Sequence, residues 1–221
     1  MSSSAGRPRV RMTGPQRRLQ LLDIGRELFG QRGYEATSIE EIAARADVSK
    51  PVVYEHFGGK EGLYAVVVER AMDDLLTRVT SALSVSGHPR VLLERAAFAL
   101  LDYIEEESDG FRVLTRDAPS TGTAGTFSSL IGEVAGKVEH ILGREFAARG
   151  YERSLAPLYS QALVGMVTLV GQWWLDTRSP AKDEVAAHLV NLAYNGLAHL
   201  ETGPGLVRRP APVPVRPRSP Q

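Results

Sequence analysis

The chain has 221 residues, of which 43% are hydrophobic and 24% are charged. A chain of this length can bury a hydrophobic core, and it suits a small domain joined to a larger one. The sequence contains no cysteine. Disulfide bonds, thiolate metal sites and cysteine nucleophiles are therefore excluded, and a reducing cytoplasm suits this composition.

The formal net charge is zero, but charge is segregated along the chain. Residues 1–60 carry 10 Lys and Arg against 7 Asp and Glu, whereas residues 61–201 carry 12 against 19. Residues 202–221 carry 4 basic residues and no acidic one. The basic amino-terminal part is where a polyanion would dock.

One segment is long and apolar enough to be weighed as a membrane span. Residues 154–175 carry no charge over a length close to the roughly 20 residues that a bilayer helix needs. Polar residues dilute this segment, and neither a second span nor an amino-terminal signal peptide accompanies it. We therefore favour a helix buried on all sides in a soluble, cytoplasmic dimer, with no membrane partner.

Helical periodicity dominates the sequence, so the expected fold class is all-α. Residues 1–14 form a flexible basic arm, whose Arg7, Arg9 and Arg11 either enter a minor groove or only solubilise the chain. The first helix is expected at residues 15–31, with a left-handed cap at Gly33. Later helices are expected at residues 60–83, 89–107, 111–117, 126–149, 155–177 and 181–201. Residues 202–221 hold six of the thirteen prolines and form a disordered tail rich in Pro and Arg.

The most informative stretch, residues 37–63, contains two short helices separated by a tight turn. Thr37 with Glu40, or Ser38 with Glu41, makes a capping box at the start of the first short helix. Four apolar residues then share one face of that helix: Ile39, Ile42, Ala43 and Ala46. Asp47 tolerates the left-handed backbone of the turn, Val48 enters the core, and Ser49 can cap the second helix.

The second short helix has an inner and an outer side. Pro51 lies in its first turn, where a missing N–H is harmless, and Val53 and Phe57 point inward. The outer surface is left with Lys50, Val52, Tyr54, Glu55 and His56. This arrangement is typical of a helix that reads the major groove of DNA.

At these residues the sequence resembles the TetR (tetracycline repressor) family. The resemblance rests on Leu28-Phe29, Gly33-Tyr34, Thr37, Ile42-Ala43, Val48-Ser49, Tyr54, His56-Phe57, Lys60-Glu61 and Leu63. It departs at Asp47, where the family usually has glycine, and at the acidic Glu55, which either accepts from a cytosine amino group or simply faces solvent. The resemblance implies a three-helix helix-turn-helix domain at residues 15–60, followed by a larger helical bundle at residues 61–201 that binds ligand and dimerises.

The resemblance also implies which residues contact double-stranded DNA. The phosphate contacts are expected from Thr37 or Ser38, and from Tyr54, His56 and Lys60, and the base contacts from Lys50, Pro51 and Val52. The chemistry of these side chains agrees, because Lys50 can donate to guanine O6 and N7, and Val52 offers apolar contact to a thymine methyl group.

The carboxyl-terminal part predicts a dimer and a cavity. An apolar stripe over residues 185–200, paired with the uncharged helix from residue 155, would form a four-helix interface across a two-fold axis. The candidate walls of an effector cavity are aromatic or sulfur-containing: Phe98, Tyr103, Phe111, Phe127, Met166, Trp173 and Trp174. Its candidate polar contacts are Gln161, Gln172, Thr168 and His140. The effector is therefore expected to be a small, largely apolar molecule.

The sequence thus predicts a homodimeric, sequence-specific transcriptional regulator, expected to be a repressor that a ligand releases from a pseudo-palindromic operator. The alternative is a helix-turn-helix regulator controlled by a protein partner, for which the Pro-rich tail is a candidate binding segment. No enzyme is expected, because the motifs of hydrolases, nucleotide-binding enzymes and zinc proteases are absent, and we expect no cofactor, metal or catalytic residue. The run from Glu105 to Glu107 is typical of a solvated helix end.

Overall fold

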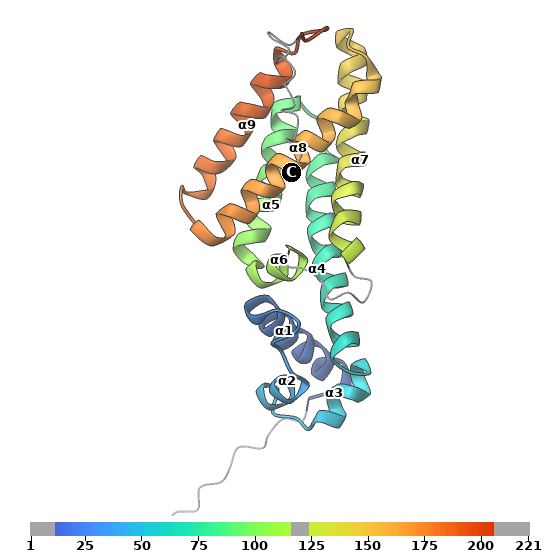
Figure 1. The fold of residues 1–221 in the computed structure, drawn as a ribbon, viewed down its shortest axis with the longest axis vertical. Helices are drawn as coiled ribbons and strands as arrows, with labels where there is room; N and C mark the ends of the chain where they lie inside the picture. Colours follow the sequence, from blue (N-terminus) through green and yellow to red (C-terminus); the bar gives the residue numbers. More distant parts are fainter. Residues whose placement is uncertain (1–11, 116–123, 206–221) are drawn as a thin grey trace, which may run out of the picture.

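The computed structural model describes residues 12–115 and 124–205, including side chains except those of residues 124–127. This part of the chain is helical and contains no β-strand, which confirms the all-α prediction. A small amino-terminal unit lies at one end of an elongated helical bundle (Figure 1). The helices are α1 (Gly14–Arg32), α2 (Ile39–Arg45), α3 (Lys50–Phe57), α4 (Lys60–Leu83), α5 (Pro89–Glu106), α6 (Ser108–Thr115), α7 (Ala124–Arg149), the 3-10 turn η1 (Arg153–Leu155), α8 (Ala156–Thr177) and α9 (Lys182–Ala198).

Local signals fix the ends of the first helices. The chain leaves α1 at Gly33, whose positive φ of 84° favours glycine, but its ψ of 171° is not the value that the predicted left-handed cap requires. Ser38 begins α2 by accepting a hydrogen bond from the Glu41 backbone N–H at 3.2 Å. Asp47, between α2 and α3, has the left-handed φ of 53° that the turn needs. The helix-turn-helix geometry is therefore encoded residue by residue.

The core of the amino-terminal unit joins all four of its helices. Val53 of α3, Ile42 of α2 and Leu63 of α4 are each 0% exposed. Gly25 of α1 lets Leu63 approach closely, since an added Cβ at residue 25 would lie 3.2 Å from Leu63 Cδ2. The first turn of α4 therefore belongs to the amino-terminal core, while the rest of that helix continues into the bundle (Figure 1).

The helix predicted at residues 111–117 begins earlier than expected, at Ser108. Gly110, which lies just before the predicted helix, is inside α6 and serves close packing. A Cβ there would lie 2.8 Å from the Tyr103 hydroxyl oxygen, which donates to the Ala71 carbonyl at 3.0 Å. The absence of a side chain at residue 110 thus reflects a tertiary contact between α5 and α6.

A second close contact joins the amino-terminal unit to the bundle. Helices α1 and α6 pack together, and a Cβ added at Gly30 would lie 2.7 Å from both the Cβ and the carbonyl oxygen of Asp109. Backbone atoms of Asp109 cannot move aside without displacing α6. Gly30 therefore sets how closely the two parts of the molecule approach.

We expect Gly30→Ala to lower the free energy of unfolding by about 1–3 kcal/mol, because the added methyl group overpacks the contact with Asp109. Urea denaturation of the purified protein measures this change. Gly136→Ala is the control, because α7 has open space at that residue and the substitution is expected to stabilise by about 0.5–1 kcal/mol. Equal effects of the two substitutions would show that the contact at Gly30 tolerates a side chain.

Candidate nucleic-acid interface and ligand cavity

Helix α3 has the two sides that its sequence predicts. Val53 is completely buried, and Phe57 packs against the same core. On the other side Lys50, Pro51 and Glu55 are exposed, and the Tyr54 side chain is 53% exposed. The anchoring residues therefore hold the helix while its outer surface stays accessible.

Arg18 of α1 fixes the carboxyl end of α3. Its guanidinium carbon lies 4.3 Å from the centre of the Phe57 ring, and its Nη1 donates to the His56 carbonyl at 2.5 Å. The helix then ends at Gly58, which has a left-handed φ of 74°. A cation at a helix carboxyl terminus is also favoured by the helix dipole.

The residues expected to contact phosphate differ in their accessibility. Ser38 and Tyr54 are exposed, and His56 and Lys60 are partly exposed. Thr37 is only 1% exposed, and its hydroxyl donates to the Gly33 carbonyl at 2.8 Å. The prediction of a phosphate contact from Thr37 is therefore corrected: its side chain fastens the end of α1 to the start of α2.

Lys60 lies at the junction of α3 and α4 and is held in place. Its Nζ lies 4.2 Å from the centre of the Tyr34 ring and 3.4 Å from the Glu35 carbonyl oxygen. These contacts keep the ammonium group close to the end of α3 while leaving it partly exposed. The group is thus positioned for a phosphate that approaches α3.

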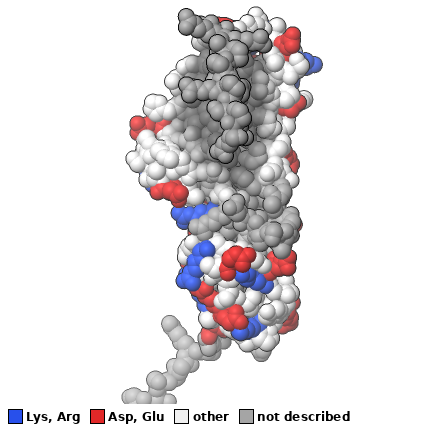
Figure 2. Space-filling model, in the orientation of Figure 1, with Lys and Arg blue, Asp and Glu red and all other residues white. Residues whose placement is uncertain are grey.

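Acidic side chains form ion pairs with several cationic side chains of the amino-terminal unit. Lys50 pairs with Glu40, Arg32 with Glu41 and Arg45 with Glu27. Both signs of charge are interspersed over this unit on the face shown in Figure 2. The hydrogen bond from Lys50 lowers the pKa of the Glu40 carboxyl group. Lys50 must therefore leave Glu40, or share it, to reach a base.

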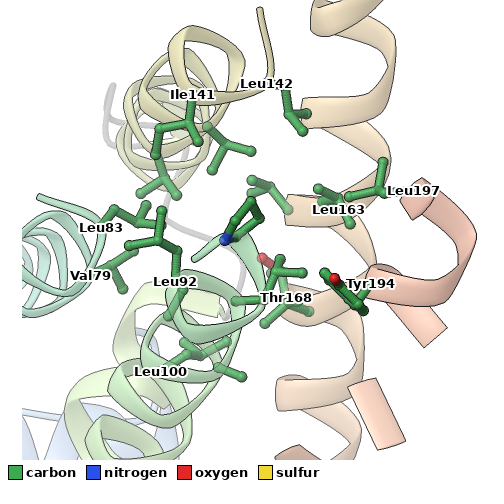
Figure 3. Close-up of a pocket in the computed structure, with 18 of the residues that line it drawn as sticks. Val79, Leu83, Leu92, Leu100, Ile141, Leu142, Leu163, Thr168, Tyr194 and Leu197 are labelled. Carbon is green, nitrogen blue, oxygen red and sulfur yellow. The ribbon is translucent and has the colours of Figure 1, made fainter. Parts of the chain in front are cut away.

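A cavity of about 490 Å³ lies inside the bundle. It is enclosed by α4, α5, α7 and α8, with the end of α9 closing one side (Figure 3). Most of its walls are aliphatic: Leu75, Val79 and Leu83 from α4, Leu92, Leu93 and Leu100 from α5, Val134, Val138, Ile141 and Leu142 from α7, and Leu163, Val164 and Val167 from α8. An apolar ligand of moderate size fits such a space.

Polar groups gather at one end of the cavity. The His88 and Tyr194 rings lie 5.6 Å apart, and Arg149 donates to the carbonyl oxygens of Leu197 and Ala198 at 3.0 and 2.7 Å. These residues belong to the start of α5 and the ends of α7 and α9, which meet at the end of the bundle remote from α1–α3 (Figure 1). Thr168 adds a hydroxyl group to the wall from α8 (Figure 3).

The predicted aromatic walls need correction. Phe111 does line the cavity. Tyr103 and Trp174 are buried elsewhere in the core, where the Tyr103 hydroxyl donates to Ala71 and Trp174 Nε1 donates to the Pro180 carbonyl at 2.9 Å. Phe98 lines a shallow hollow on the outer face of α5.

Two further predicted wall residues, Met166 and Trp173, do not line the cavity either. Met166 packs against the core, and Trp173 is 51% exposed. The Phe127 side chain lies outside the described residues. The aliphatic walls were missed because Leu, Val and Ile at helical spacing are the same signal as ordinary core packing.

The outer face of α8 is apolar and exposed. Leu158, Leu169 and Trp173 are 64%, 66% and 51% exposed, and Leu192 on α9 is 65% exposed. The segment Arg153–Thr177 is also long and apolar enough to cross a membrane by length and composition. In this fold it packs along α7 and against α5. Large apolar side chains that are exposed together mark a surface that binds another protein or lipid.

Two family models match separate parts of the chain. Residues 21–67 match the model of bacterial regulatory proteins of the tetR family. Residues 89–196 match the model of a tetracyclin repressor-like carboxyl-terminal domain. The first match covers part of α1, all of α2 and α3 and the start of α4, and the second covers α5 to α8 and most of α9.

Individual proteins are similar over different lengths. The HTH-type transcriptional activator FasR of Mycolicibacterium smegmatis is 33% identical over 193 residues, which cover 86% of this chain and 87% of that protein. The HTH-type transcriptional repressor Rv3405c of Mycobacterium tuberculosis is 41% identical over 76 residues, or 34% of this chain and 38% of that protein. A TetR-like transcriptional regulator from Rhodococcus sp. RHA1 has a crystal structure that matches with a TM-score of 0.73 and 28% identity, covering 85% of this chain and 99% of that one.

We expect Glu40→Gln to strengthen binding to mixed-sequence DNA, because the freed Lys50, which finds no matching base on such DNA, can neutralise a phosphate. The slope of log K against log salt should steepen by about one unit, as one more phosphate is neutralised. Fluorescence anisotropy at several salt concentrations measures the slope. Glu27→Gln is the control, since it removes the same charge but frees Arg45 of α2 instead. Identical slopes in the two variants would contradict a special role for the pair of Lys50 and Glu40.

Proposed function

Because the chain belongs to the tetR family of bacterial regulatory proteins, we propose that a small, largely apolar ligand in the bundle cavity controls how its DNA-binding helices meet an operator. The chain is a DNA-binding transcriptional regulator of the helix-turn-helix type. The DNA-binding part of this proposal rests on helix α3, in which Val53 is buried and Lys50 and Tyr54 face outward. An accessible helix anchored in this way can enter a major groove.

We place the dimer interface on α8 and α9. The exposed residues Leu158, Leu169 and Trp173 follow one side of α8, and Leu192 adds an apolar contact from α9. Two copies of these helices related by a two-fold axis would cover this surface as a four-helix interface. The same burial accounts for the apolar character of α8 in a cytoplasmic protein. The dimer then presents two α3 helices to the half-sites of a pseudo-palindromic operator.

The ligand of this proposal is elongated, with one polar end. The cavity volume of about 490 Å³ falls within the range of about 300–1,000 Å³ that is typical of small-molecule sites. The aliphatic walls favour an apolar body, while His88, Arg149 and Tyr194 offer hydrogen bonds and a positive charge at the remote end. The wall also carries the Glu145 carboxylate, so an anionic group would suit the part of that end next to Arg149.

Helix α4 supplies the mechanical link from ligand to DNA. Leu75, Val79 and Leu83 on its carboxyl-terminal half line the cavity, and Leu63 in its first turn is buried in the amino-terminal core. A ligand that moves the cavity end of α4 therefore moves the α3 helix packed against its other end. The two amino-terminal units of the dimer, its DNA-binding heads, can lie at different separations. A ligand shifts the equilibrium between two such separations only if it binds the two states with different affinity.

For the sign of regulation we keep the proposal of a repressor that its ligand releases. The relatives named as repressors include Rv3405c, which matches 34% of this chain, whereas FasR, named as an activator, matches 86% of it. Transcription in vitro from a promoter that carries the bound site separates the two, since a repressor lowers the yield of transcript and an activator raises it. Control by a protein partner is the alternative to a small ligand.

For DNA recognition, we expect Tyr54→Phe to weaken binding to all sequences alike, whereas Lys50→Ala changes the preference among sites. The reason is that phosphate contacts set position and affinity, and base contacts set sequence. Loss of one good base contact should cost about 1–3 kcal/mol at a single base-pair position. Selection of bound fragments from random DNA, followed by affinity measurements on the selected site and its single-base variants, provides the data.

The two variants differ in outcome if the division of roles is right. A shift of base preference in Tyr54→Phe, or a uniform loss of affinity in Lys50→Ala, would contradict it. Failure of the unmodified protein to enrich any sequence would contradict sequence-specific binding itself.

For the ligand, we expect straight-chain fatty acids of suitable length to raise the Tm of the protein and their methyl esters to raise it less, because Arg149 favours an anion. A ligand at 100 times its Kd stabilises the folded state by about 2.7 kcal/mol. Ala96→Phe should abolish the shift by filling the cavity. Ala99→Phe on the same helix is the control, since residue 99 faces the shallow outer hollow.

A Tm shift that survives in Ala96→Phe would place the ligand outside the cavity. A flat response of the unmodified protein across an apolar library would favour control by a protein partner.

A further inference from the structure

The three consecutive glutamates at the end of α5 each reach a different helix. Glu105 pairs with Lys182 of α9, with 2.5 Å between Oε2 and Nζ. Glu106 accepts from Arg78 of α4 at 2.6 Å. Glu107 pairs with Arg26 of α1. We name these three glutamates the acidic junction: Glu105 and Glu106 are exposed, as predicted for a solvated helix end, but all three side chains also reach cations of other helices.

The charges at the acidic junction are arranged against their intrinsic preference. Carboxylates are disfavoured at the carboxyl end of a helix by the helix dipole, and neighbouring like charges repel one another. Each of these carboxylates is offset by a cation from another element rather than by a neighbour on α5. Arg178, at the turn between α8 and α9, adds donors to the Ile104 carbonyl at 3.0 Å and the Ser108 hydroxyl at 2.6 Å. The end of α5 is therefore a meeting point of α1, α4 and α9.

Close packing surrounds the ion pairs. Arg78 also lies over the Tyr103 ring, with 5.4 Å from its guanidinium carbon to the ring centre. Gly30 of α1 touches Asp109 just beyond the junction. Leu100, which lines the cavity, lies about two helical turns before Glu107 in the chain. The junction thus lies between the cavity wall and the amino-terminal unit.

Of the three ion pairs of the acidic junction, the pair of Glu107 and Arg26 has the least exposed carboxylate. The Glu107 side chain is 28% exposed, against 59% for Glu106 and 51% for Glu105. Exposed ion pairs contribute little to the free energy of unfolding, so variants at these carboxylates are expected to fold. A change at Glu107 would act on the orientation of α1, which carries the contacts of Arg18 to α3.

We propose that the acidic junction couples the spacing of the DNA-binding heads to the bundle, with Glu107 as the positioning residue that holds α1 through Arg26. Glu106 ties the same helix end to α4, and Glu105 ties it to α9 next to the dimer surface. The inference rests on the proposed function for the dimer, but it concerns the protein before DNA or ligand binds. Loss of the Glu107 contact frees α1 and its attached α3 to adopt a wider range of positions.

The distance between the two heads of the dimer tests this directly. The chain has no cysteine, so Glu55→Cys on exposed α3 provides one spin-label site per protomer. Double electron–electron resonance then gives the distribution of label separations without DNA or ligand. In this background, Glu107→Gln should broaden the distribution, as expected for a unit released at a hinge. Glu94→Gln should leave it unchanged, since it removes an α5 carboxylate that pairs only along its own helix, with Arg90.

Charge exchange provides the second arm. Arg26→Glu alone should broaden the distribution, and Arg26→Glu combined with Glu107→Arg should restore the narrow one. Circular dichroism and sedimentation verify that each variant is folded and dimeric. Unchanged widths in Glu107→Gln, equal broadening in Glu94→Gln, or failure of the exchange to restore the width would each overturn the proposal, as would a chain that stays monomeric. A failure to bind DNA leaves these distances unaffected, so the two proposals fail separately.

Discussion

One helix is shared by two hydrophobic cores, and the rest of the molecule depends on that constraint. Leu63, in the first turn of α4, is completely buried in the amino-terminal core, while Leu75, Val79 and Leu83 further along line the cavity. A long α-helix can curve gently but kinks sharply only at an identifiable feature such as a proline, and α4 has no proline. Movement at the cavity end is therefore transmitted to α3 rather than absorbed within the helix.

A second connection runs beside α4 and constrains how the amino-terminal unit can turn. Helix α1 meets α6 at the close approach of Gly30 and Asp109, and Arg26 reaches Glu107. Two connections at separate places define the orientation of the amino-terminal unit relative to the bundle, whereas α4 alone would define only its position. An ion pair also constrains a side chain within the amino-terminal unit: Glu40 holds Lys50, the cation that we propose contacts a base. Binding of DNA then replaces one carboxylate by the anions of the duplex.

The sequence could predict the helix-turn-helix because its signals are local. Gly33, Ser38 and Asp47 each impose a backbone conformation or a cap that needs no distant partner. The bounds of α4, Lys60–Leu83, were also predicted correctly from periodicity and flanking residues. The anchoring of Val53 followed from its position on the helix, and its complete burial confirms it.

The cavity and the acidic junction could not be predicted in the same way. Periodicity identifies the inward face of a helix but does not tell whether that face meets another side chain or an empty space. Aromatic size therefore misled the prediction at Tyr103 and Trp174, which fill the core and satisfy their polar atoms there. The ion pairs of Glu105 to Glu107 could not be predicted because their partners lie on helices far away in sequence.

Recognition by α3 in the major groove is tested most directly by methylation interference on the selected DNA site. Dimethyl sulfate modifies guanine N7 in the major groove and adenine N3 in the minor groove. Binding of a dimer through two α3 helices predicts that guanine N7 methylation blocks complex formation in two major-groove segments separated by about 10 base pairs or a multiple of that repeat. Interference confined to adenine N3, or to one isolated segment, would contradict it.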